Sequence, residues 1–89
     1  MTASKYDIED ALWSISPDCS HDEWYRIAAA IYDALGDDGF DLFDQWSSYS
    51  QTKYPGRRAC RRQWDHSKRL TKITVGTLFF FAKQHRHAV

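Results

Sequence analysis

The sequence predicts an all-α protein, a compact bundle of about five short helices around a hydrophobic C-terminal helix. Three observations predict this class. Apolar residues recur at three- and four-residue spacing, capping residues precede several of these segments, and Pro, Gly or Ser residues separate them. The 89 residues are expected to form a single helical domain, residues 1–89, and its four Trp, five Tyr and five Phe can supply a core.

The first two helices follow from their starts and stops. A first helix is expected from about Lys5 to Ile15, and Ser16-Pro17 ends it because proline disfavours a helical residue before it. Ser20 and Glu23 form a capping box for a second helix, His21 to Leu35, which ends at Gly36. The second helix has one apolar stripe, made up of Trp24, Ile27, Ala28, Ile31 and Leu35.

The next two helices flank a loop over residues 47–56 that is rich in Ser, Tyr, Pro and Gly. A third helix is expected from Phe40 to about Ser48, and the short break before it predicts an antiparallel neighbour. The fourth helix is expected from Arg57 to Ser67. At 100° per residue, Cys60, Trp64 and Ser67 share a narrow arc that can face the core.

The last helix, from Val75 onward, is apolar nearly all round. A helix of this kind is normally central. We therefore expect the earlier helices to surround it. Its final residues are expected to fray into solvent, namely His85, Arg86 and His87.

Net charge is zero, but the charges are unevenly distributed along the chain. Residues 1–50 hold two basic and eleven acidic residues, a net charge of −9. Residues 51–89 hold ten basic residues and one acidic residue, a net charge of +9. Folding either lays the acidic helices against the basic one or keeps the two charges on opposite faces, and only the second outcome gives a polyanion-binding surface.

The segment from Lys53 to Lys72 carries the strongest functional signal. Several Arg and Lys on one helix face and its following loop match the electrostatic footprint of phosphate-backbone binding. Asp65 lies within the basic arc and can brace Arg61 or Arg62. Trp64 is expected in the core rather than as a base-stacking platform. The candidate nucleic-acid-binding residues are Lys53, Arg57, Arg58, Arg61, Arg62, Lys68, Arg69 and Lys72.

Other chemistry has little support in the sequence. No catalytic residue and no cofactor is predicted, because no phosphate-binding Gly-rich loop or nucleophile elbow occurs. No metal site is predicted either, since Cys19-x-His21 and His85-x-His87 do not match zinc spacing. Cys19 and Cys60 are expected to be buried thiols. Without a signal peptide or a membrane-length apolar run, the protein is expected to be cytoplasmic, with no membrane contact.

Several motifs occur in a recognisable order: A-L-W-S-I-S-P-D, W-Y-R-I-A-A-A-I-Y-D-A-L-G, D-G-F-D-L-F-D-Q-W-S, a tryptophan in a basic helix, and K-I-T-V-G-T-L-F-F-F-A-K. Together they resemble the primase C-terminal domain type 2 (PriCT-2) family over about Ile8 to Lys83. The most specific pieces are Asp38-Gly39-Phe40 with Trp46-Ser47, and Ile73-Thr74 with Gly76-Thr77-Leu78. The resemblance implies a small helical domain beside primase-polymerase modules of phages, plasmids and other mobile genetic elements, and one that is not itself the nucleotidyl transferase.

The combined interpretation is an accessory domain in DNA replication priming. It is expected to bind template DNA, single-stranded by preference, or initiating nucleotides through the basic segment. Its expected partner is a primase-polymerase catalytic domain in cis or in trans, with a replicative helicase as a further candidate. Two alternatives remain: a docking module for a primase, polymerase or helicase that never touches DNA, and, ranked lowest, a helix-turn-helix regulator that reads duplex DNA.

Overall fold

The computed structural model describes residues 4–87, and within this range it contains α-helices, one 3₁₀ helix and no strand. The predicted all-α class is confirmed. The helix bounds agree closely with those expected from the sequence, except that the first helix ends two residues early. The elements are α1 (Lys5–Trp13), α2 (His21–Leu35), η1 (Gly36–Gly39), α3 (Phe40–Ser47), α4 (Arg57–Ser67) and α5 (Val75–His87).

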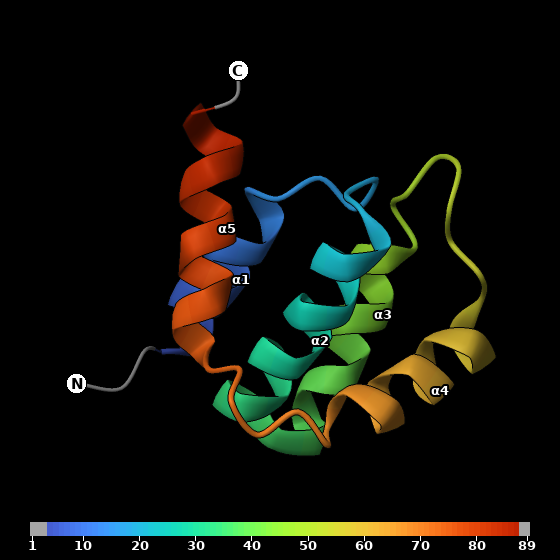
Figure 1. The fold of residues 1–89 in the computed structure, drawn as a ribbon. Coiled ribbons are helices and arrows are strands. Elements are labelled where there is room, and N and C mark those ends of the chain that lie inside the picture. The colour runs from blue at the N-terminus through green and yellow to red at the C-terminus, as the bar shows by residue number, and fades with distance from the viewer. Residues whose placement is uncertain (1–3, 88–89) are drawn as a thin grey trace.

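The central element is α2, which packs against every other helix. In Figure 1, α1 and α5 lie on one side of α2, and α3 and α4 lie on the other. All five residues from Ile27 to Ile31 are buried, although three of them are alanines. Small side chains let neighbouring helices approach α2 from several directions at once, and this makes it the core of the bundle.

The prediction that the C-terminal helix is central is wrong. α5 lies at the periphery, where it contacts α1 and α2. It buries Leu78, Phe81 and Ala82. On its other side Phe80 is 58% exposed and Phe79 is 36% exposed.

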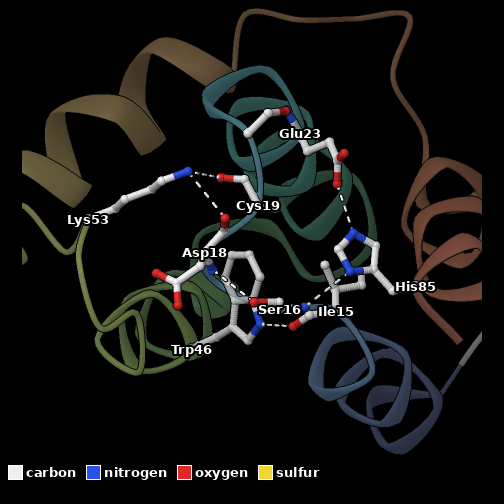
Figure 2. Close-up of polar contacts among 9 residues, drawn as sticks. Ile15, Ser16, Asp18, Cys19, Glu23, Trp46, Lys53 and His85 are labelled. Carbon is white, nitrogen blue, oxygen red and sulfur yellow. Dashed lines mark hydrogen bonds and ion pairs between the residues drawn. The ribbon is translucent and has the colours of Figure 1, made fainter. Parts of the chain in front are cut away.

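The end of α5 does not fray, in contrast to the prediction. His85 Nε2 lies 2.9 Å from Glu23 Oε2, and the backbone N–H of Ser16 donates to His85 Nδ1 at 3.4 Å (Figure 2). Arg86 pairs with Asp10 at 3.2 Å. These long-range contacts hold the last turn of α5 against α1 and the start of α2.

Side chains satisfy backbone N–H groups at the starts of α1, α2 and α5. Ser4 and Asp7 form a complete capping box for α1. At α2, the Ser20 hydroxyl accepts from the backbone N–H of Glu23, but the Glu23 carboxylate binds His85 and so does not complete the predicted box. The first N–H of α5, at Val75, donates to Asp33 Oδ2 at 3.0 Å, which links α5 to α2.

One close approach fixes the corner between α2 and α3. A Cβ added at Gly39 would lie 2.7 Å from Ile31 Cγ2 and 3.3 Å from Trp64 Cη2. The corner therefore requires glycine for space. A separate contact joins α3 to the end of α1, where the indole N–H of the fully buried Trp46 donates to the carbonyl of Ile15 at 2.9 Å (Figure 2). Across residues 4–87, no helix combines the length and apolar character needed to cross a membrane.

Candidate nucleic-acid interface

The basic helix α4 is placed by its inward face. Cys60, Trp64 and Ser67 are completely buried, as the sequence predicts. The Trp64 ring packs against Tyr32, Phe40 and Phe43, and its indole N–H donates to Asp37 at 3.1 Å. Trp64 is therefore a core residue, and the arginines of α4 lie on the remaining surface of the helix.

Arg57 binds the acidic side of α3. Its guanidinium lies 2.6 Å from Asp41 and 3.0 Å from Asp44, and Asp44 is itself buried. The hydrogen bond to Asp41 is the main cause of the raised pKa of Arg57. The guanidinium also stacks over the Phe40 ring at 4.9 Å, a favourable cation–π contact. Arg57 thus joins α4 to α3.

Arg61 and Lys68 are also held by carboxylates. Arg61 pairs with Asp65 at 3.4 Å, and its guanidinium lies 4.8 Å from the centre of the Phe40 ring. Lys68 lies 2.8 Å from Asp37 and 3.4 Å from Asp65. The hydrogen bonds from Lys68 and then Trp64 hold the pKa of Asp37 below its ordinary value. Asp65 therefore braces Arg61 rather than Arg62.

Lys53 connects two loops (Figure 2). Its ammonium donates to the backbone carbonyls of Asp18 and Cys19, at 3.2 and 2.9 Å. The Asp18 carboxylate in turn accepts from the hydroxyl of Ser50, which is the main cause of its lowered pKa, and from Gln51 and Thr52. The connection between α1 and α2 is thereby tied to the loop between α3 and α4.

The other four predicted residues are exposed and have no ion pair or side-chain hydrogen bond within residues 4–87. Arg58 and Arg62 are one turn apart on the outer face of α4, where residues at i and i+4 are neighbours. Arg69 and Lys72 follow on the connection between α4 and α5. We call these four residues, Arg58, Arg62, Arg69 and Lys72, the cationic row.

The structure also contains a pocket that the sequence did not predict. It lies between the start of α2, the loop before α4 and the flank of α4, and its volume is about 600 Å³. The sequence places Trp24 in the apolar stripe of α2 and Cys19 among the buried thiols, and neither feature indicates a pocket. The lining residues are Pro17, Cys19, His21, Trp24, Ser47, Ser50, Lys53, Tyr54, Pro55, Ala59, Arg62, Gln63 and His66.

Two of the residues that line this pocket have strongly shifted pKa values. The Tyr54 hydroxyl donates to Asp44 at 2.8 Å, which raises the pKa of Tyr54 to about 12. Burial raises the pKa of the Cys19 thiol to about 11. Both therefore stay protonated at neutral pH, and neither is an activated nucleophile. Among residues 4–87, no three His, Cys, Asp or Glu side chains are grouped so that they could hold a metal ion.

These features describe a small helical bundle in which four exposed cations without a partner among residues 4–87 lie on α4 and on the connection that follows it. A family model, primase C terminal 2 (PriCT-2), matches residues 8–82. The chain belongs to this family, and the resemblance seen in the sequence is confirmed. The family associates the domain with primases. No curated protein and no solved structure gives a significant match to the chain.

Proposed function

We propose that this domain is a non-catalytic accessory of a primase-polymerase and that it holds single-stranded template DNA through the cationic row. The observation that carries the proposal is the division of the basic segment. Arg57, Arg61 and Lys68 neutralise carboxylates of the protein, whereas the cationic row has no such partner among residues 4–87. Exposed, unpaired cations are the groups that release counterions on binding a phosphate backbone.

The accessory role is supported by the family and by the carboxylates. A metal-dependent nucleotidyl transferase needs carboxylates that hold two metal ions. Here Asp41 and Asp44 bind Arg57, and Asp37 binds Lys68. These carboxylates stabilise the packing of α4, which favours a structural role. Chemistry is therefore assigned to the partner, a primase-polymerase catalytic domain in cis or in trans.

Fluorescence anisotropy with a labelled single-stranded oligonucleotide tests the proposal. The wild-type domain is expected to bind at low salt, and the double variant Arg58→Glu with Arg62→Glu is expected to lose that binding. The matched control is Lys5→Glu with Lys83→Glu, which makes the same change in net charge at exposed sites on α1 and α5. Absence of wild-type binding at low salt, or equal loss in both double variants, contradicts the proposal.

A second candidate function is docking to the primase-polymerase without DNA contact. The exposed Phe79 and Phe80 on α5 favour it, since exposed aromatic side chains on one helix are typical of protein-protein contacts. Docking is tested by capture of the catalytic domain after nuclease treatment. The docking function is supported if the double variant Phe79→Glu with Phe80→Glu loses this capture and the double variant Arg58→Glu with Arg62→Glu retains it. Retained capture by the phenylalanine variant excludes this face.

A further inference from the structure

The pocket beside α4 shares one residue, Arg62, with the cationic row. Arg62 belongs to both, because its side chain lines the pocket and its helix position continues the line from Arg58. Other lining residues come from the start of α2 and the connection before it, and from the loop that carries Lys53. A strand with a phosphate bound to Arg62 therefore lies next to the pocket.

The lining of the pocket is selective in its chemistry. Two prolines and the rings of Trp24 and Tyr54 supply flat apolar walls, while Arg62, Lys53 and two histidines supply basic groups. None of the lining residues is acidic, in a chain with twelve Asp and Glu. A flat ring attached to a negative group matches both properties, because bases stack on aromatic side chains and phosphates bind cations.

The walls are held in place before any ligand binds. The Trp24 indole N–H donates to Ser47 at 2.9 Å, and its ring packs on Phe43 with centroids 5.3 Å apart. The Tyr54 hydroxyl is fixed by Asp44, and Lys53 ties the loop of Tyr54 to the connection before α2. The volume of about 600 Å³ falls within the roughly 300–1,000 Å³ typical of small-ligand sites.

We infer that this pocket takes one unstacked base of the single-stranded DNA, with the adjoining phosphate on Arg62. The inference rests on the proposed function, since the same strand occupies the cationic row. It adds a reason for preferring single strands, because a base in a duplex is stacked and paired and cannot enter. An acidic peptide offers the negative charge as well, but the continuity of the pocket with the row favours a polymer of regularly spaced phosphates.

The test compares two labelled oligonucleotides of equal length and charge, one with intact bases and one with an abasic backbone. The wild-type domain is expected to bind the abasic strand about 5- to 150-fold more weakly, the range for loss of one stacked base. Ala59→Trp, which places a ring in the pocket, is expected to bind the intact strand as weakly as the abasic one. Gln45→Trp, on the exposed surface of α3, is the matched control and keeps the difference.

The outcomes separate this inference from the proposed function. Equal wild-type affinity for the two strands overturns the pocket and leaves the cationic row in place. Undiminished binding of the intact strand by a folded Ala59→Trp also overturns it. Absence of binding to either strand at low salt overturns the proposed function, and the pocket assignment with it. The comparison of strands needs no substitution, so a poorly folded variant cannot decide the result.

Discussion

The salt dependence of DNA binding distinguishes the cationic row from the full basic segment. For single strands, the logarithm of the binding constant falls with the logarithm of salt concentration at a slope of about −0.7 per phosphate neutralised. Four contacts give a slope of about −3, and all eight predicted residues give about −6. Between 50 and 200 mM salt, affinity is expected to fall about 50-fold with four contacts and about 2,000-fold with eight.

Anisotropy titrations at four salt concentrations measure this slope. Neutralising Arg58 and Arg62 to Gln is expected to reduce it to about −1.5, since two contacts remain. Neutralising Arg57 and Arg61 to Gln is the matched control, expected to leave the slope near −3 because their charges are balanced within the protein. Circular dichroism establishes that both variants are folded. A wild-type slope near −6, or a slope reduced by the control pair, refutes the division of the basic segment.

Three further predictions concern stability and reactivity. Gly39→Ala is expected to destabilise the folded protein by about 1–3 kcal/mol through overpacking, which lowers Tm by roughly 5–20 °C. Gly76→Ala has room for the added methyl group in α5 and is expected to stabilise the folded protein by about 0.5–1 kcal/mol. Equal Tm values for the two variants contradict this prediction. The folded protein lowers the pKa of Asp37 below its ordinary value of 3.8, so the ionised carboxylate stabilises the fold at pH values above 3.8. This stabilisation is lost as the pH falls through the lowered pKa. In urea titrations, Asp37→Asn should therefore have a lower free energy of unfolding than wild type at pH 6, and the difference should shrink at pH 2.5. A difference that does not change with pH argues against this role of Asp37. Burial raises the thiol pKa of Cys19 and of Cys60 to about 11, so both should resist alkylation by iodoacetamide at pH 8 until the protein is denatured. Mass spectrometry measures the extent of alkylation, and rapid labelling of Cys60 in the native protein is inconsistent with its burial.

Local sequence signals were sufficient for most of the secondary structure. The bounds of α2 and α4 were predicted correctly, because each has a clear apolar arc and a defined start. The inward position of Trp64 followed from the same arc. These features depend only on residues within one or two turns, so a single sequence contains the information that determines them.

The position of the helices in the bundle was harder to predict. The run of phenylalanines in α5 made that helix look central, but apolar composition does not specify how many neighbours a helix has. The deciding feature was in α2, where Ala28, Ala29 and Ala30 allow close approach on three sides. Three consecutive small residues in an apolar helix were visible in the sequence, and they indicate a crowded helix better than large side chains do.

The candidate site was predicted only in part, because ion pairs depend on contacts distant in sequence. The carboxylates that bind the basic segment come mostly from Asp37, Asp41 and Asp44. These residues precede Arg57, the first residue of α4, by 13 to 20 positions in the sequence. Helical phase within α4 places Arg57 nearer the buried arc than Arg58, but it does not show which carboxylates Arg57 meets. The pocket was missed for the same reason, since its walls come from three separate segments.

Asp65 shows how folding changes the meaning of a charge. In the sequence it lies within the basic arc and can brace either Arg61 or Arg62. In the structure its carboxylate faces Arg61 and Lys68, so it neutralises the flank of α4 that already packs toward Phe40. The carboxylates that pair with α4 all lie on this flank or within α4 itself. Charge cancellation is therefore one-sided: it fastens α4 to the bundle and leaves the positive charge of Arg58 and Arg62 on the outer face, where Arg62 also lines the pocket.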